Sequence, residues 1–214
     1  MTDDLYKNII NTLKDNSIED FEKIFAMLEI EKINSKEDFK IFASHLINHS
    51  NPVREAFMMK LEDIIQENYI DDEILDILTS TLCDINPNVA RQMCLILEKH
   101  PKIAQNLEPN IISKTFYLLE ELEQEKTKNN KSHAKNKKLF SLYWLLEGLS
   151  YCVTGKYNQK IRKILKNSID FECYTIREKI AKIALKLKPE SEDIIEILKN
   201  DNNFYVNFCV NSCI

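Results

Sequence analysis

The side chains best suited to chemistry are basic ones, concentrated in one part of a chain whose net charge is −5. Residues 1–125 carry a net charge of −13, residues 126–188 carry +12 and residues 189–214 carry −4. Lysine and arginine bind phosphate and release its counterions, so the basic part could bind a polyanion or an acidic partner. The candidate binding residues in this part are Lys156, Lys160, Arg162, Lys163, Lys166, Lys179, Lys182 and Lys186.

Two other interpretations of the same basic residues remain open. Lysines often solvate the outer faces of helices, and Lys179, Lys182 and Lys186 are spaced to form such a stripe opposite the apolar face of one predicted helix. Alternatively, the acidic first half of one molecule could contact the basic half of another. Aromatic residues do not alternate with the lysines, so a nucleic acid would be bound through its phosphates rather than its bases.

Metal-ligand spacings are present but incomplete. His45 and His49 lie four residues apart, and so do Cys209 and Cys213, which places two ligands on one helix face. Zinc requires further ligands, and neither pair has them nearby in the sequence. We therefore interpret the two histidines as exposed helical side chains, and we expect neither a metal nor another cofactor.

The cysteines and the first residues indicate a cytoplasmic protein. The six cysteines form no Cys-x-x-Cys pair and lie mostly among apolar helical residues, as reduced core thiols do. The chain begins with an acidic segment unlike a signal peptide, and no apolar stretch approaches the ~20 residues of a membrane span. We expect no membrane association.

Common enzyme motifs are missing from the sequence. The chain contains only two glycines, Gly148 and Gly155, too few for a phosphate-binding loop or a dinucleotide-binding fingerprint. No Gly-x-Ser-x-Gly elbow occurs, and no cysteine is visibly paired with a histidine. These features predict a protein that is not an enzyme.

Apolar residues recur with helical spacing along almost the whole chain, which predicts an all-α fold. Phe21, Phe25 and Leu28, for example, are expected to form the buried face of one helix. The five prolines are expected between helices, because proline removes a backbone hydrogen bond from a helix interior. The capping residues expected at helix starts are Thr2, Ser35 and Asp71.

The starts of the predicted helices repeat along the chain. The equivalent positions are residues 53, 89, 139, 176 and 206. Their successive intervals are 36, 50, 37 and 30 residues, and the longest contains the basic segment 125–138, which is predicted to be a loop insertion. A period of ~35–40 residues built from helix pairs is typical of stacked helical hairpins.

These helix starts resemble those of HEAT repeats. Asp84 and Asp201 each precede a valine by five residues, and Arg54 and Arg177 each follow an aliphatic residue at a helix start. The resemblance implies a right-handed α-solenoid of about five to six stacked HEAT-like helical hairpins. It also implies that these four side chains link neighbouring repeats as a structural ladder, since a partly buried arginine needs such a partner.

The same resemblance implies the domain organisation and the function. It covers residues 36–214, and residues 1–35 are expected to add an N-terminal helix pair, which makes residues 1–214 one HEAT-like domain. HEAT proteins are mostly scaffolds and adaptors, so we expect the concave face or the basic part 126–188 to bind a macromolecule. A protein partner is expected first, and a nucleic acid or another polyanion is the alternative.

A second resemblance defines the alternative function. DNA-alkylation-repeat glycosylases are similar in architecture, and their damaged base meets aromatic and acidic residues of the concave face. Trp144, with Tyr143, Glu147 and Tyr151 nearby, could play this part in a nucleic-acid-binding protein. A single tryptophan within the apolar run 139–149 is more typical of a helix core.

The last residues leave a further choice open. Residues 203–214 are expected to form a terminal helix with an unusually apolar sequence. Either this helix packs inward, or its open side mediates self-association, because the exposed face of a terminal repeat is sticky.

Overall fold

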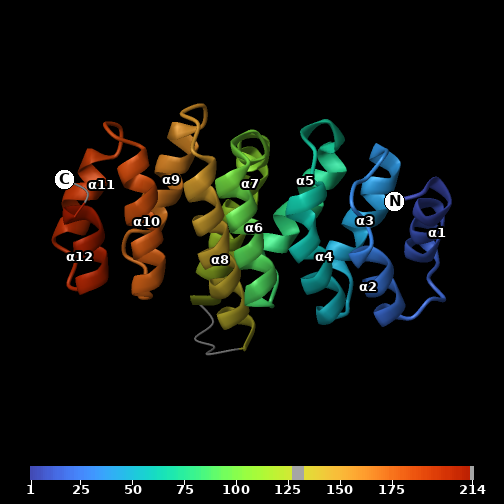
Figure 1. Ribbon diagram of the computed structural model, residues 1–214. Helices are drawn as coiled ribbons and strands as arrows, with labels where there is room; N and C mark the ends of the chain where they lie inside the picture. The colour runs from blue at the N-terminus through green and yellow to red at the C-terminus, as the bar shows by residue number, and fades with distance from the viewer. Residues whose placement is uncertain (127–132, 213–214) are drawn as a thin grey trace. The chain divides into compact units, whose positions relative to one another are not determined.

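The computed structural model describes residues 1–126 and 133–212, and these ranges contain helices, turns and irregular segments but no strand (Figure 1). The predicted all-α fold is confirmed. The chain divides into two compact units, Met1–Ile96 and Leu97–Ile214. The expectation of a single domain over residues 1–214 stays a prediction. Among the described helices, none combines the length and the apolar character that crossing a membrane requires.

The first unit is built from helices that alternate between two layers. Its elements are α1 (Asp3–Lys14), α2 (Asp20–Leu28), α3 (Lys36–Ser44), η1 (His45–Ile47), α4 (Asn51–Ile64), η2 (Glu67–Tyr69), α5 (Asp72–Leu82) and most of α6 (Pro87–Lys99). Helix α3 packs between α1 and α5, whereas α2 packs against α4. Helix α1 also contacts α2, so consecutive helices pair while alternate helices form the layers.

Aromatic packing and side-chain caps fix the helices of this unit. Phe42 and Phe57 are completely buried, and their ring centroids lie 4.9 Å apart. The predicted caps are confirmed, since the side chains of Thr2, Ser35 and Asp71 each accept a hydrogen bond from a backbone N–H in the first helical turn.

Helix α2 is oriented differently from the prediction. Phe21, Phe25 and Leu28 are 53%, 65% and 56% exposed, so the prediction that they form its buried face is wrong. Lys23 and Met27 lie in the interior instead. The hydrophobic pattern of a helix identifies its apolar side, but the contacts of α2 with α1 and α4 decide which side is covered.

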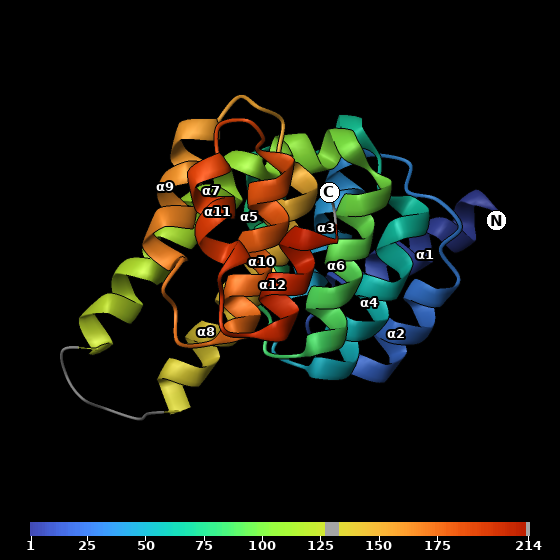
Figure 2. The same ribbon diagram turned by 90° about the vertical axis from the view of Figure 1, so that its left-hand side faces the viewer.

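The second unit has the same two-layered arrangement (Figures 1 and 2). It contains the end of α6 and the helices α7 (Pro101–Lys126), α8 (His133–Cys152), α9 (Asn158–Ser168), α10 (Tyr174–Lys186), α11 (Glu192–Lys199) and α12 (Phe204–Asn211). Helix α10 packs between α8 and α12 in one layer, and α7 contacts α9 in the other. The pairs α7–α8 and α11–α12 are in contact as hairpins, so both units are built from stacked helical hairpins.

The predicted loop insertion at residues 125–138 is shorter than expected. Helices α7 and α8 extend into it from both sides, and residues 127–132 lie outside the described residues. Part of the reason is Lys138 of α8, whose ammonium group lies 2.8 Å from Glu125 and 3.3 Å from Glu121 of α7. These ion pairs join the two helix ends where the sequence alone suggests a charged loop.

Pro109 lies inside α7, so the prediction that all prolines fall between helices is wrong. Proline has no N–H for the carbonyl four residues earlier, but that residue, Gln105, is exposed and water can reach it. The neighbouring Glu108 is buried, and its carboxylate accepts hydrogen bonds from the hydroxyl and the N–H of Thr154 at 2.5 and 3.3 Å. This contact holds α7 against the turn before α9, where Gly155 has a φ of +90°.

His45 is buried, which corrects its interpretation as an exposed side chain. Its Nε2 atom lies 3.0 Å from the carbonyl oxygen of Leu13, and its ring centroid lies 4.6 Å from that of Phe57. Burial lowers the pKa of His45, because the interior disfavours the charged imidazolium.

The burial of His45 predicts that acid destabilises the first unit. The unfolded chain binds this proton near pH 6.5, whereas the folded chain binds it only at a lower pH. The free energy of unfolding should therefore decrease, by up to about 1.4 kcal/mol per pH unit, as the pH falls from about 6.5 toward the pKa of the folded state. Urea unfolding between about pH 7 and 5 should show this slope for the wild type and a smaller slope for His45→Gln.

The matched control is His49→Gln, because His49 is exposed and belongs to the same segment. This variant should keep the wild-type slope. Equal slopes for His45→Gln and the wild type would contradict the assignment of the acid sensitivity to His45.

Candidate binding surfaces

Arg54 and Asp84 form an ion pair at the first turn of α4. Arg54 Nε and Nη2 donate to the two Asp84 carboxylate oxygens at 2.5 and 3.0 Å, and the two side chains are only 9% and 6% exposed. Arg54 Nη1 also donates to the carbonyl oxygens of Asn48 and His49 at 2.7 and 3.1 Å. The pair therefore joins the turn before α4 to the turn before α6.

Arg177 and Asp201 repeat this geometry in the second unit. Arg177 Nε and Nη2 donate to the Asp201 carboxylate at 2.6 and 2.9 Å, and Nη1 donates to the carbonyl oxygens of Phe171 and Glu172 at 2.5 and 3.2 Å. Their hydrogen bonds raise the pKa of Arg177 and lower the pKa of Asp201. The structure thus brings the four predicted ladder residues together as two equivalent pairs, one in each unit.

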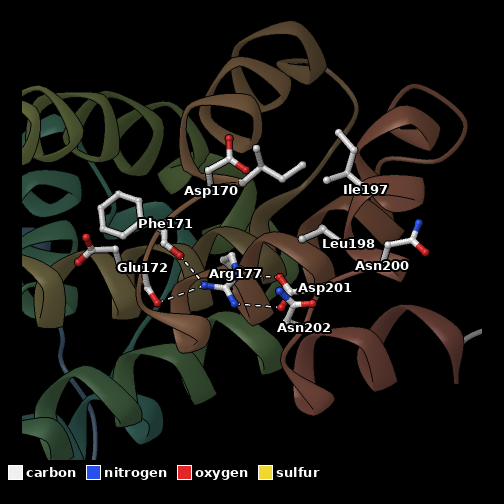
Figure 3. Close-up of a pocket in the computed structure, with 10 residues that line it drawn as sticks. Asp170, Phe171, Glu172, Arg177, Ile197, Leu198, Asn200, Asp201 and Asn202 are labelled. Carbon is white, nitrogen blue, oxygen red and sulfur yellow. Dashed lines mark hydrogen bonds and ion pairs between the residues drawn. The ribbon is translucent and has the colours of Figure 1, made fainter.

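A cavity of about 310 Å³ lies beside the second pair (Figure 3). Its walls include Asp170, Ile197 and Asn200 as well as Arg177 and Asp201. Because Arg177 already donates to one carboxylate and two carbonyls, its guanidinium group has little capacity left for a ligand. We assign these contacts to the stability of the stack and assign no ligand to the cavity.

Two predicted binding residues of α9 are engaged inside the second unit. Arg162 donates to the Asp193 carboxylate of α11 at 2.8 and 2.6 Å and also to the backbone carbonyl of Glu190. Lys166 lies 3.6 Å from the same carboxylate. The hydrogen bonds from Arg162 lower the pKa of Asp193. These two basic side chains hold α9 to α11.

Lys179 is buried between α8 and α10, so its place in the predicted solvated stripe is wrong. Its ammonium group lies 2.8 Å from the Glu147 carboxylate and 4.6 Å from the ring centroid of Tyr143. Burial is the largest single effect and opposes the charge of Lys179, but the bonding and charge of Glu147 together with Tyr143 outweigh it and raise the pKa of Lys179 above its ordinary value. A buried, paired ammonium group cannot also reach an external phosphate.

Lys182 and Lys186 also contact their own unit. Lys182 lies 3.5 Å from Glu178 and 3.9 Å from Glu147. Lys186 donates to the backbone carbonyl of Ser150 at 2.5 Å and lies 5.2 Å from the ring centroid of Tyr151. The stripe predicted on α10 is therefore mostly a line of contacts with α8.

Three predicted binding residues remain exposed without a carboxylate partner in the described residues. Lys156 and Lys160 lie 5.2 and 5.6 Å from the ring centroid of Tyr157, and Lys163 lies 5.6 Å from that of Phe116. Exposed cation–π contacts are weak, so these ammonium groups are available to solvent and to an anion.

The residues of the predicted glycosylase-like site share helix α8. Trp144 is half-buried and packs edge-on against Phe140 and Tyr143, with ring centroids 6.1 and 5.0 Å apart. The Tyr151 hydroxyl lies 3.4 Å from the Glu147 carboxylate, which also binds Lys179. The only acidic side chain of the predicted set is therefore engaged by a lysine.

The predicted metal-ligand pairs are not extended into larger clusters in the described part of the chain. Within residues 1–126 and 133–212, no group of three or more His, Cys, Asp or Glu side chains could hold a metal ion. His45 points to the carbonyl oxygen of Leu13, and Cys213 lies outside the described residues.

Four aromatic side chains of α10 and α12 form an exposed surface that we name the aromatic surface. It consists of Tyr174, Phe204, Tyr205 and Phe208, which are between 41% and 68% exposed. Ring centroids lie 6.0 Å apart for Tyr174 and Tyr205, and 5.6 Å apart for Phe204 and each of Tyr205 and Phe208. Isolated exposed rings are ordinary, but four rings in mutual contact make a contiguous patch.

Helix α12 packs inward, which is one of the two alternatives left open for the terminal helix, and self-association through its open side stays a prediction. Val206 and Val210 are buried, so one face packs inward, while the rings of the aromatic surface lie on the other. One feature of the sequence indicates this surface: residues 202–212 contain aromatic residues and no charged side chain. Whether a solvent-facing ring touches another ring of α10 cannot be predicted from the spacing within α12.

Comparisons with known proteins assign no family to the chain. No protein-family model matches the chain, and no curated protein matches it. A designed armadillo repeat protein aligns with 13% identity and a TM-score of 0.47 over 96% of each chain. An engineered protein from a structural-genomics programme aligns with 13% identity and a TM-score of 0.43 over 98% of this chain and 94% of its own. At these scores, neither protein assigns a function or a partner to this chain.

Removal of Arg54 should destabilise the first unit strongly. Arg54→Ala removes the cation and two of the donors of the buried Asp84 carboxylate, which keeps only the backbone N–H of Asn86, so the free energy of unfolding should fall by about 3–5 kcal/mol. Arg54→Lys should recover only part of this loss, because an ammonium group cannot form the two-pronged contact. Urea unfolding measures both effects.

Arg91 provides a matched control for this measurement. Its side chain is exposed on α6, and Arg91→Ala should change the free energy of unfolding by no more than about 0.5 kcal/mol. A loss for Arg54→Ala no larger than that for Arg91→Ala would refute the structural role of the ladder pair.

Proposed function

We propose that this chain is a non-catalytic, HEAT-like scaffold that binds another protein through the aromatic surface of α10 and α12. The observation that carries the proposal is the mutual contact of four exposed rings in Tyr174, Phe204, Tyr205 and Phe208. The cores of protein interfaces are enriched in aromatic residues and depleted in charged ones. The uncharged segment 202–212 has this composition.

The internal use of the basic residues favours a protein partner over a polyanion. Among the eight predicted binding residues, Arg162, Lys166, Lys179, Lys182 and Lys186 contact groups of their own unit. Only Lys156, Lys160 and Lys163 remain for phosphate, and three contacts give weaker and less salt-dependent binding than eight. Nucleic-acid binding is therefore the second candidate, and its specific support is these three exposed lysines.

The resemblance to HEAT repeats supports the scaffold role. The two Arg–Asp pairs stand at equivalent helix starts, as the resemblance implies for a structural ladder. HEAT proteins are mostly scaffolds and adaptors, and we propose the same lack of catalysis for this chain. The cysteines, which form no Cys-x-x-Cys pair, support a cytoplasmic location. The partner could also be a second copy that docks on α12.

Substitutions on the aromatic surface should abolish partner binding without unfolding the chain. Phe204→Ser with Phe208→Ser removes two exposed rings, so the melting temperature should stay near the wild-type value. Chemical cross-linking with mass spectrometry, in extract of the source cells, should identify a partner whose cross-links surround α12 and which the double variant no longer retains. Sedimentation velocity of the purified chain tests whether that partner is a second copy.

The matched control is Lys160→Glu with Lys163→Glu, which changes the exposed basic residues and leaves the rings intact. This variant should retain the partner. Titration of labelled duplex DNA and single-stranded RNA at about 50 and 200 mM salt completes the test. Tight, salt-sensitive binding that the lysine variant loses, together with a partner that the phenylalanine variant retains, would replace the protein-binding proposal by the nucleic-acid one.

A further inference from the structure

A second exposed apolar surface lies on the first unit, on helix α2. Phe21, Phe25 and Leu28 recur at the i, i+4 and i+7 positions of this helix, and each is more than half exposed. The rings of Phe21 and Phe25 touch edge to face, with centroids 6.3 Å apart. Met59 of α4, the neighbouring helix of the same layer, is 67% exposed. We name Phe21, Phe25 and Leu28 the α2 surface.

The orientation of α2 costs free energy as long as no partner covers the α2 surface. The helix turns its apolar side to solvent and places Lys23, which is 5% exposed, in the interior. Together the three side chains leave roughly 300–400 Å² of apolar area in water, which is as large as the largest patch on a typical monomer. The largest apolar patch on a monomer is often functional.

Acidic side chains border the α2 surface. Glu22 and Glu29 each follow a residue of the surface in sequence, and both are exposed. Helix α2 and its two cap residues carry one basic side chain, the buried Lys23. On the neighbouring α4, Lys60 is engaged by Asp63 at 3.5 Å. A partner bound to the α2 surface therefore contacts apolar side chains that lie next to exposed carboxylates. No exposed basic residue of α2 neutralises these carboxylates.

We propose that the α2 surface binds an amphipathic helix of a partner protein that carries leucine-like residues on one face and lysine or arginine at its borders. The apolar face of such a helix covers Phe21, Phe25 and Leu28, and its basic residues approach Glu22 and Glu29. The spacing suits this occupant, because residues at i, i+4 and i+7 present a ridge to a second helix. Opposite charges at the border fix the orientation and accelerate association.

A second copy of this chain fits the α2 surface less well. Two α2 helices facing each other would bring Glu22 and Glu29 against the same acidic residues. Helix α9 carries exposed lysines, but its apolar residues Ile161, Ile164 and Leu165 are already buried in the second unit. Neither arrangement offers both the apolar face and the basic border.

The proposal goes beyond the scaffold function assigned to the aromatic surface of α10 and α12. The two surfaces lie in different units and require different substitutions, so each can fail alone. Loss of binding at the α2 surface leaves the cross-linking test of Phe204 and Phe208 unaffected.

Fluorescence anisotropy with a synthetic helix tests the proposal on the full chain. The probe is a labelled peptide of about 18 residues with leucine on one helical face and lysine elsewhere, and the same residues in scrambled order serve as the control peptide. The amphipathic peptide should bind the wild type at least about tenfold more tightly than the scrambled one. Phe25→Ser with Leu28→Ser should remove this preference, and Glu22→Lys with Glu29→Lys should weaken binding about tenfold at about 50 mM salt.

Matched variants in the second unit distinguish the surface from general stickiness and charge. Ile197→Ser removes an exposed apolar residue of α11, and Glu172→Lys with Glu192→Lys reverses two exposed acidic residues. Both should bind the peptide as the wild type does. The proposal is overturned if the Phe25/Leu28 variant keeps the preference, or if the second-unit variants lose as much affinity as the α2 variants. Concentration-dependent self-association that only the α2 variants abolish would assign the surface to a second copy instead.

Discussion

A buried two-pronged contact between an arginine and an aspartate holds the helix starts in both units. In Arg54 and Arg177, the Nε and Nη2 atoms donate to the two carboxylate oxygens of one aspartate. The Nη1 atom of each arginine donates to two backbone carbonyl oxygens. Those carbonyls belong to the turns before α4 and α10, so each arginine also fastens the turn that precedes its own helix. The aspartate belongs to the turn before the next helix of the same layer. One side-chain pair thereby fixes the spacing of adjacent hairpins, and the packing of each layer depends on it.

Part of the strong charge asymmetry of the chain has a structural explanation. The basic part of the sequence, residues 126–188, carries a net charge of +12, and several of its cations contact acidic residues or carbonyls of the second unit. Lys138 joins α8 to α7, Arg162 joins α9 to α11, and Lys179 joins α10 to α8. A sequence that looks like a polyanion-binding segment is thus, for many of its residues, the basic half of internal ion pairs between neighbouring helices. The net charge of a segment counts these cations as available, although the fold has already neutralised them.

Two of the surfaces that remain available are apolar, and both lie on helices that have neighbours on only part of their circumference. Helix α2 packs against α1 and α4, and α12 packs against α10 and α11. Each of these helices buries a narrow strip, Lys23 and Met27 in α2 and Val206 and Val210 in α12. The aromatic residues on their other sides stay in water and form exposed apolar surfaces.

Local patterns along the sequence determined the helices, their caps and the repeated helix starts. Thr2, Ser35 and Asp71 cap helices because a side-chain oxygen reaches a backbone N–H three residues away, and that distance is encoded locally. The positions of Arg54 and Asp84 at helix starts also predicted them as ladder residues, and the structure shows that the two side chains pair. Tertiary structure alone decided which side of α2 is covered, that Lys179 is buried against Glu147, and that Tyr174 touches Tyr205. Each of these outcomes depends on contacts between separate helices, and periodicity within one helix carries no information about which neighbour covers which face.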